Sequence, residues 1–347
     1  GHARELGRLL GRTIKWVQDI HGEKAMKAIE AMKDGDILML NNIRMDPEEV
    51  GSKGDTLALS ETSLIQDLAS VADVFVNDAF ACAHRNSPSI VGFVHHLPCV
   101  AGELMAHEIR QLDLALDSPA RPCIAVLGGI KVDDSIEVAL NMLNNAIADE
   151  VWLTGGVANL AIHLSGHDIG EGNVEFLRNE LKDAWEPTVD SAKSLLSTYA
   201  DKIVLPIDVA ANVEGNRIDL KVEELPIHAP LFDLGLQSIR ALSTRIKGAG
   251  TIILNGPAGV FELPDFALGT IEMLSACAET NGYALMGGGH TATLVSKRGL
   301  SHKMGHVSTG GGACLGYIAG RTLPGIHALE LSAQRYQLEI TPIVHEE

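Results

Sequence analysis

The stretch His306-Val307-Ser308-Thr309-Gly310-Gly311-Gly312-Ala313 joins the end of an apolar strand to a short helical segment at residues 314–319. Consecutive glycines carry no side chains, so the backbone can approach a ligand closely and adopt positive φ angles. The N–H groups that open the following helix lack internal partners and carry the positive end of its dipole. Such a turn is typical of a phosphate site. Taken alone, the stretch fits equally well a tight strand-to-helix turn that binds nothing.

The same arrangement recurs from residue 123 onward, where short apolar runs end in glycine, asparagine or aspartate. The runs are residues 123–127, 151–153, 203–207, 251–254, 283–286 and 303–307. Predicted helices, such as 134–147, 236–247 and 267–280, separate most of them. Strands that alternate with helices indicate a parallel α/β sheet, whose ligands bind beyond the carboxyl ends of the strands. The turns at these ends contain Gly128, Gly129, Gly155, Asn255, Gly256, Pro257, Gly287, Gly288 and Gly289.

Basic side chains follow two apolar runs in the first third of the chain. Arg44 comes soon after residues 37–40, a run typical of a buried parallel strand. The pair His84-Arg85 comes soon after a second strand at residues 74–76. Such a pair can bind a carboxylate or a phosphate, although a solvated loop explains it more simply. Helices are expected at residues 3–12, 23–33 and 57–70.

A domain junction is predicted near the end of a helix at residues 102–116. Pro119 and Pro122 follow this helix, and a new strand begins directly after them. A helix, a proline-containing break and a new strand together indicate a boundary between two domains.

Composition restricts the classes of function. The chain has 347 residues, of which 46% are hydrophobic, which is enough for two domains with complete cores. Its net charge of −18 repels nucleic acid and anionic membranes, so an anion site would need local basic groups such as Lys131. The five cysteines are scattered without a CxxC pair, which favours reduced thiols in the cytoplasm over disulfides or a zinc site.

Several common nucleotide and hydrolase motifs do not occur. The chain has no GxGxxG opening a βαβ unit, no GxxxxGK[ST] loop and no GxSxG elbow. A dehydrogenase, a Walker ATPase and a serine hydrolase are therefore disfavoured. Lys131 follows the turn Gly128-Gly129 and can place a point charge on a phosphate. The alternative for Lys131 is a solvated lysine at a helix start, which the dipole slightly disfavours.

Four motifs in order resemble those of the phosphoglycerate kinase family, and the resemblance covers essentially the whole chain. They lie at residues 76–85, 127–132, 255–262 and 308–313. The resemblance implies two Rossmann-like, three-layer α/β/α domains with parallel sheets, joined by an interdomain helix and closing by hinge bending. It implies reversible phosphoryl transfer between 1,3-bisphosphoglycerate and Mg-ADP, giving 3-phosphoglycerate and ATP in glycolysis. It implies a cytoplasmic monomer or homodimer that binds neither nucleic acid nor membrane.

The resemblance also implies roles for individual residues. Arg44, His84 and Arg85 are similar to the basic patch that holds 3-phosphoglycerate. Lys131 resembles the lysine that stabilises the transferring group, and the amides of Gly310, Gly311 and Gly312 would receive that group. The residues similar to nucleotide contacts are Gly128, Gly129, Lys131, Gly155, Asn255, Gly256, Pro257, Glu262, Gly287, Gly288, Gly289 and Thr291, with Glu262 toward the ribose.

Domain boundaries follow from the same resemblance. Residues 1–101, with a returning segment at 321–347, would form the domain that binds 3-phosphoglycerate. Residues 102–119 would form the interdomain helix and linker. Residues 120–320 would form the nucleotide-binding domain.

Two substitutions depart from many family members and resemble its archaeal branch. Ser135 stands where many members carry a second phosphate lysine. His290 stands where many carry the aspartate that meets Mg²⁺. Because imidazole is a poor ligand for this hard cation, the metal ligands are left open, with nucleotide oxygens and water as candidates.

The family's opening segment has no counterpart ahead of residues 3–12. At roughly 30 residues per unit, two strand–helix units correspond to on the order of 60 residues. They carry an Asp-x-Asn strand end and arginines of the substrate patch. The alternative function is therefore a noncatalytic nucleotide-binding remnant of the same fold, and a dehydrogenase is a distant third.

Overall fold

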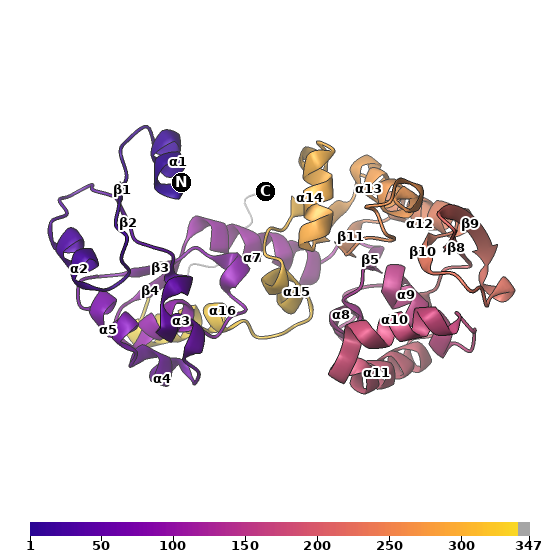
Figure 1. The fold of residues 1–347 in the computed structure, drawn as a ribbon, viewed down its shortest axis with the longest axis horizontal. Helices are drawn as coiled ribbons and strands as arrows, with labels where there is room; N and C mark the ends of the chain where they lie inside the picture. The colour runs from indigo at the N-terminus through magenta and orange to yellow at the C-terminus, as the bar shows by residue number, and fades with distance from the viewer. Residues whose placement is uncertain (339–347) are drawn as a thin grey trace. The chain divides into compact units, whose positions relative to one another are not determined.

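The computed structural model describes residues 1–338, except for the side chain of His290, and in it the chain forms two compact units (Figure 1). Unit 1 comprises Gly1–His107 together with the described residues from Thr322 onward. Unit 2 comprises Glu108–Arg321. Helix α7 (Glu103–Leu116) begins in unit 1 and ends in unit 2. Among the described residues, none of the helices combines the length and apolar character needed to cross a membrane.

Unit 2 is built on a six-stranded sheet in which all neighbouring strands are parallel. Across the sheet the order is β13-β12-β11-β5-β6-β7, so the direction of strand addition reverses between β5 and β11. Ligands of open α/β sheets bind beyond the strand ends at such a switch point. The strands are β5 (Cys123–Leu127), β6 (Glu150–Leu153), β7 (Ile203–Val204), β11 (Thr251–Asn255), β12 (Tyr283–Gly287) and β13 (His306–Val307).

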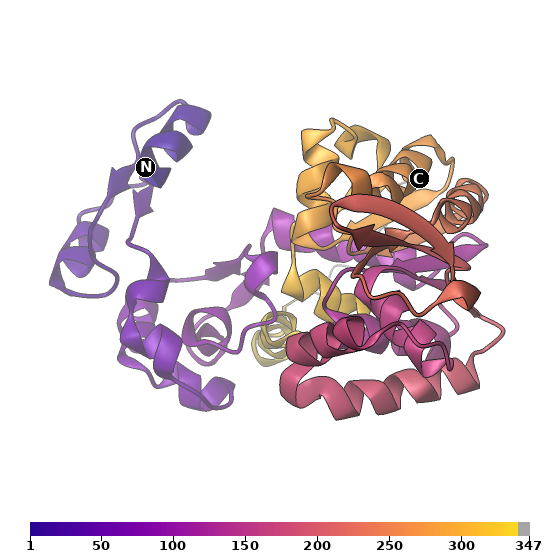
Figure 2. The ribbon, with the colours of Figure 1, turned by 45° about the vertical axis from the view of Figure 1, so that its right-hand side comes forward.

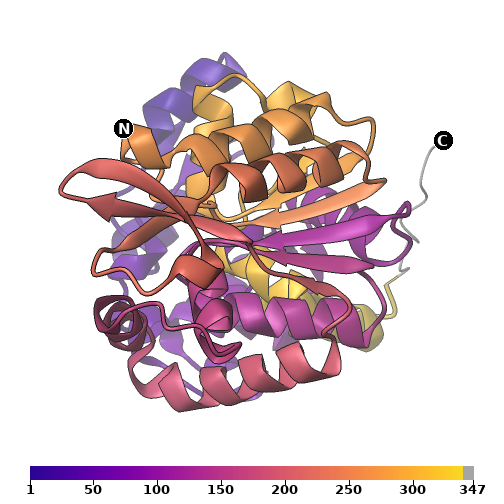
Figure 3. The same ribbon diagram turned by 90° about the vertical axis from the view of Figure 1, so that its right-hand side faces the viewer.

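Helices cover both faces of this sheet (Figure 3). On one face α8, α9 and α11 pack together, and α12 packs on α13 on the other. Every residue of β5 and β11 is buried, as expected for strands covered on both faces, and the α/β class predicted from sequence is confirmed. The helices are α8 (Val132–Asn144), α9 (Gly155–Leu164), α10 (Glu171–Leu181), α11 (Trp185–Thr198), α12 (Leu236–Lys247), α13 (Leu268–Glu279), α14 (Gly289–Lys297) and α15 (Gly312–Ile318).

The strand predicted at residues 203–207 is shorter in the structure. Only β7 joins the parallel sheet, and Pro206 soon follows it; proline has no N–H to donate to a ladder. The chain then forms an antiparallel sheet of β8 (Asp208–Val213), β9 (Asn216–Lys221) and β10 (Leu231–Leu234) that the sequence analysis missed. Glu214 and Gly215, both at positive φ, connect β8 to β9, as a two-residue hairpin requires.

Unit 1 contains two separate pairs of short parallel strands among helices (Figure 2). The strands are β1 (Lys15–Trp16), β2 (Leu38–Met39), β3 (Phe75–Asn77) and β4 (Cys99–Ala101). The helices are α1 (His2–Leu10), α2 (Glu23–Glu30), α3 (Pro47–Gly51), α4 (Thr56–Ser60), α5 (Ser63–Ala69), α6 (Pro88–Val91) and α16 (Pro324–Tyr336). Residues 37–40 were expected to be buried, but β2 is only half-buried because β1 is its single partner strand.

The helix predicted at residues 57–70 is divided in two. Helix α4 begins at a cap made by Asp55, whose carboxylate accepts from Ala58 N–H at 2.9 Å. Helix α5 has its own start, where Glu48 accepts from Leu64 N–H at 2.8 Å. Leu57, in the first of the two helices, is 55% exposed.

The described residues at the end of the chain pack in unit 1. Helix α16 contacts β4, far from it in sequence, and Figure 1 shows it in yellow among purple elements. Cys99 N–H donates to Ser332 Oγ at 2.7 Å, and Gly325 N–H donates to Ala83 O at 2.8 Å.

Candidate active site

The loops after β5 and β11 meet at the switch point of the unit 2 sheet. Gly128 N–H donates to Asn255 O, and Gly129 N–H donates to Pro257 O, both at 2.8 Å. A Cβ on Gly128 would collide with Pro257 O, and one on Gly256, where φ is +82°, would collide with Gly128 O. These two glycines are therefore required for the loops to pack together, whether or not a ligand binds.

A cavity of about 400 Å³ opens at this junction and gathers most of the glycine turns found in the sequence. Lys131 also lines it, is exposed, and has no ion-pair partner among the described residues. Its lining includes Gly128, Gly129, Asn255, Gly256, Pro257, Gly288, Gly289, Thr291, Gly311 and Gly312. The structure thus brings together a lysine and backbone-rich turns from several strand ends, a suitable setting for phosphate oxygens. We call this space the polar cavity.

Two sequence-predicted site residues, Gly287 and Gly310, are not part of the lining of the polar cavity. Gly287 is buried at the end of β12, opposite Asn255 of β11. Gly310 is buried, and its N–H donates to Ser308 Oγ at 3.1 Å. Ser135, noted in the sequence for its departure from the family, is fully buried on α8, and its Oγ has no hydrogen-bond partner among the described residues. The side chain of His290 lies outside the described part of the structure.

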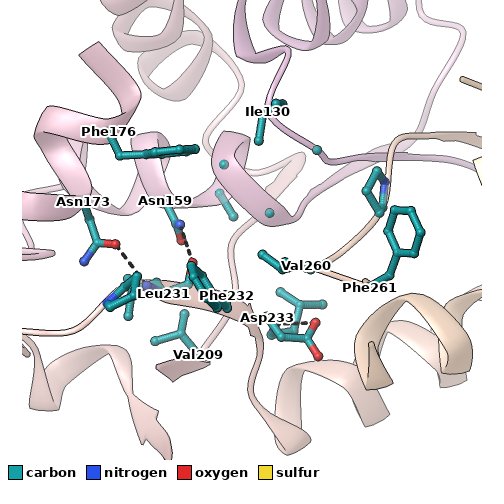
Figure 4. Close-up of a pocket in the computed structure, with 18 of the residues that line it drawn as sticks. Ile130, Asn159, Asn173, Phe176, Val209, Leu231, Phe232, Asp233, Val260 and Phe261 are labelled. Atoms are coloured by element: carbon teal, nitrogen blue, oxygen red, sulfur yellow. Dashed lines mark hydrogen bonds between the residues drawn. The ribbon is translucent and has the colours of Figure 1, made fainter. Parts of the chain in front are cut away.

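A second cavity, of about 550 Å³, adjoins the polar cavity and shares Gly129, Ile130 and Pro257 with it. Figure 4 shows its mostly apolar lining, including Phe176 of α10 and Leu231 of β10. Asn173 shapes the wall, because its side-chain oxygen accepts from Leu231 N–H at 3.0 Å. Besides the shared Gly129 and Pro257, two further sequence-predicted residues, Gly155 and Glu262, line this apolar cavity. An apolar slot with a few polar groups suits a planar ring.

The sequence analysis missed the apolar residues of this slot. Phe176, Leu231 and Phe232 belong to α10 and β10, neither of which was assigned from sequence. The run Leu231-Phe232 was a usable signal of a strand, but nothing in its spacing showed that it would meet the glycine turns.

A buried carboxylate supports the glycine turn with which the sequence analysis began. Glu108 of α7 accepts hydrogen bonds from Thr309 N–H at 3.0 Å, from Thr309 Oγ1 at 2.9 Å and from His306 Nε2 at 2.9 Å. Burial acts to raise the pKa of Glu108, but these donors and Ser308 outweigh it and lower the pKa to about 2. No sequence signal marked Glu108, since a single glutamate in a helix is most often solvated.

Unit 1 contains a separate cavity of about 310 Å³ whose lining combines basic, acidic, polar and apolar side chains. Arg44 and Arg85 line it, and neither guanidinium has a partner among the described residues. Asn77 is 2% exposed, and its Nδ2 has no hydrogen-bond acceptor within residues 1–338. His84 is exposed and is not among the lining residues. The two arginines and the unsatisfied buried amide are groups that can bind an anion, and the carboxylates of Glu49 and Asp78 line the same cavity.

The lining of this cavity is held by Glu49, which the sequence analysis did not single out. Glu49 is 3% exposed and accepts from Ser87 Oγ at 2.7 Å and from Ser89 Oγ at 2.8 Å. These bonds fix the loop that follows Arg85.

Residues 1–321 match the sequence profile of the family described as phosphoglycerate kinase. The chain belongs to the phosphoglycerate kinase family. The phosphoglycerate kinase of Methanothermobacter thermautotrophicus is 43% identical over 95% of this chain and 79% of its own length. That of Methanosarcina mazei is 43% identical over 97% of this chain and 80% of its own length.

Solved structures agree with this assignment. The crystal structure of phosphoglycerate kinase from Pyrococcus horikoshii superposes with a TM-score of 0.86 at 36% identity, covering 97% of this chain and 82% of that one. The structure of the enzyme from Coxiella burnetii gives 0.74 at 30% identity, covering 96% and 80%. The resemblance to phosphoglycerate kinases seen in the motifs, including its archaeal character, is confirmed.

Proposed function

We propose that the chain transfers a phosphoryl group reversibly between 1,3-bisphosphoglycerate and ADP, giving 3-phosphoglycerate and ATP. The observation that carries the proposal is Lys131 in the polar cavity, among glycine turns from several strand ends and next to an apolar slot. Phosphoryl transfer depends on positioning and charge stabilisation more than on a protein nucleophile. This set of residues supplies both.

Nucleotide binding is assigned to the two adjoining cavities of unit 2. The apolar cavity accepts the base, with Glu262 at its edge toward the ribose. The turns at Gly128, Gly256 and Gly288 hold the phosphates in the polar cavity. Mg²⁺, when bound with the nucleotide, supplies positive charge to the phosphate oxygens.

In the transfer itself, the Lys131 ammonium offsets charge on the moving phosphoryl group. The amides of Gly310, Gly311 and Gly312 are proposed to receive that group, which for Gly310 requires its N–H to leave Ser308 Oγ. Glu108 keeps their loop in position through Thr309.

The acidic substrate is assigned to the cavity of unit 1. Arg44 and Arg85 would pair with its phosphate or carboxylate, and Asn77 Nδ2 would donate to it. We also propose that the substrate contacts His84, which directly precedes Arg85 in the chain. We keep the domain roles expected from the family: residues 1–101 with 321–347 for the acid, 120–320 for the nucleotide, and 102–119 between them. Residues 339–347 of this assignment lie outside the described part of the chain.

Closure of the two domains around both substrates is part of the proposal. The reacting oxygen and phosphorus must approach to about 3–3.5 Å for transfer. Water must be excluded at that moment, because it would hydrolyse the acyl phosphate.

The state of the cysteines supports placing the protein in a reducing compartment. All five are free, and four of them are buried. Unpaired thiols are usual in the cytoplasm, where we place the enzyme, as a monomer or homodimer.

A coupled assay of ATP formation from 1,3-bisphosphoglycerate and Mg-ADP tests the proposal. Saturable ATP production is expected, with a kcat that falls roughly 10²-fold or more in Lys131→Ala. Mg-ADP binding by calorimetry without any turnover would instead favour the noncatalytic nucleotide-binding protein.

A further inference from the structure

The polar cavity contains more negative than positive side-chain charge. Among the described residues, its charged lining consists of Lys131, Asp133 and Glu180. Asp133 lies in the first turn of α8, and Glu180 is the next-to-last residue of α10. Neither carboxylate has a hydrogen-bond or ion-pair partner within residues 1–338. A space that receives nucleotide phosphates therefore presents two unpaired carboxylates to them.

Neighbouring acids are already used within the fold. Arg321 forms ion pairs with Asp134, at 2.8 Å, and with Glu137 on the next turn of α8. Asp133 is the remaining acid at this end of α8, and it lines the cavity.

The dipole of its own helix stabilises the negative charge of Asp133 but not that of Glu180. Asp133 benefits from the positive end of the α8 dipole. Glu180 lies near the C-terminus of α10, where the dipole disfavours a negative charge. Glu180 is exposed at the cavity wall and has no stabilising partner among the described residues.

A third observation points to a ligand in the same space. Thr291 lines the polar cavity and is 1% exposed, yet its Oγ1 has no hydrogen-bond partner among the described residues. Buried hydroxyls without a partner are rare, so this oxygen is available to a bound group. A hydroxyl and two carboxylates form an all-oxygen donor set, which hard cations prefer.

We propose that Asp133 and Glu180 are the carboxylates that hold the nucleotide-bound Mg²⁺ in the polar cavity. The inference rests on the proposed function, since it requires a nucleotide there. Mg²⁺ in such sites usually binds one or two carboxylates together with substrate phosphates and water. The cation converts the repulsion between these carboxylates and the phosphates into attraction. The imidazole of His290 is not required, and it would be a poor ligand for this ion.

The test compares ATP binding with and without metal, by calorimetry on the full chain. The measured quantity is the coupling factor, defined as the ATP Kd in excess EDTA divided by the ATP Kd in excess Mg²⁺. In Asp133→Asn/Glu180→Gln, removal of the two charges should tighten metal-free ATP binding and weaken Mg-ATP binding. The coupling factor should therefore fall by roughly fivefold or more, the lower end of typical coupling between two ligands.

Glu175→Gln is the matched control, because Glu175 is exposed on α10 and does not line the cavity. Its coupling factor should equal that of the wild type. If the double variant, checked for folding by circular dichroism, also keeps the wild-type factor, the metal is held elsewhere and the inference is wrong; the two single variants give the same test should the double variant not fold. Absence of ATP binding by the wild type would overturn the proposed function and this inference with it.

Discussion

Oε2 of Glu108, on α7, lies 2.9 Å from Nε2 of His306, the first residue of β13. The Glu108 side chain is 2% exposed, and its other oxygen accepts two hydrogen bonds from Thr309. Thr309 directly precedes the three glycines. The helix that connects the two units is therefore hydrogen-bonded, through one carboxylate, to the loop proposed to receive the phosphoryl group.

We expect Glu108→Gln to destabilise unit 2. An amide cannot accept all the bonds of the carboxylate, and leaving buried donors unsatisfied costs about 1–3 kcal/mol. Urea unfolding at pH 7 measures this loss. Glu103→Gln, at an exposed position on the same helix, should unfold like the wild type. Equal stability of the Glu108 and Glu103 variants would show that the Glu108 bonds contribute nothing net.

The contribution of Glu108 should also depend on pH. Its pKa is lowered from 4.5 to about 2 in the folded protein, so folding favours its charged form. Its stabilisation is then fully present above pH 4.5 and is lost as the pH falls toward 2. The difference in unfolding free energy between wild type and Glu108→Gln should shrink over that interval. A difference that stayed constant down to pH 2.5 would mean that the carboxylate does not titrate as a bound anion.

Lys131→Ala should lower kcat far more than it changes the KM for ADP. A charge used on the transferring group acts mainly in the transition state. Loss of one such group costs roughly 10²-fold or more in kcat. Lys193→Ala, at an exposed position on α11, is the control for loss of a positive charge. A raised KM with unchanged kcat would assign Lys131 to ground-state binding.

The parallel sheet of unit 2 was predictable because its strands are covered on both faces. Runs such as residues 123–127 and 252–254 are continuously apolar and end in glycine or asparagine. The apolar run predicts a buried strand, and the residue that ends it marks the ligand-binding edge of the sheet. The β8–β10 sheet was missed because its strands have mixed polarity, as in the exposed residues of β9. Local pattern does not distinguish such a strand from a loop.

The phosphate-binding part of the candidate site was predictable because its residues lie at the ends of the same apolar strands. Glycine turns and Lys131 occupy strand ends, which parallel topology brings to one edge. Asp133, Glu180 and Phe176 were not predicted, because their place on a cavity wall depends on how α8 and α10 pack. The role of Glu108 depends on its contact with His306, which lies 198 residues further along the chain. No local sequence pattern predicts such a contact.

His21 should stabilise unit 1 in a pH-dependent way. Its Nδ1 lies 2.8 Å from Asp67 and its Nε2 lies 3.0 Å from Asp46, so both ring nitrogens face carboxylates. Burial acts to lower the pKa of His21, but hydrogen bonds to Asp67 and Asp46 outweigh it and raise the pKa above 6.5. The nearby Glu48 carboxylate favours the same charged form. The stabilisation is therefore fully present below pH 6.5 and is lost as the pH rises through the folded pKa.

His21→Gln tests this by thermal unfolding between pH 5.5 and pH 9. The variant should be less stable by about 0.5–1.5 kcal/mol at the acid end, the usual net worth of a hydrogen bond. The gap should close toward pH 9. His2→Gln, at an exposed position, should show no such trend. If the stability difference between the wild type and the variant instead grew as the pH rose, a protonated His21 in the folded protein would be excluded.

The last prediction concerns how much of α7 unit 2 needs in order to fold alone. From Glu108 onward, α7 belongs to unit 2. Tyr283 Oη donates to the Gln111 side chain at 2.8 Å, and Tyr317 Oη donates to Asp113 at 2.6 Å. Leu112 is fully buried, which alone is worth about 1.5–3 kcal/mol. A fragment of residues 103–321 should therefore fold and bind Mg-ATP, and one of residues 120–321 should be less stable by about 3 kcal/mol or more. Urea unfolding and calorimetry on the two fragments measure this, and equal stability would show that α7 is only a connector.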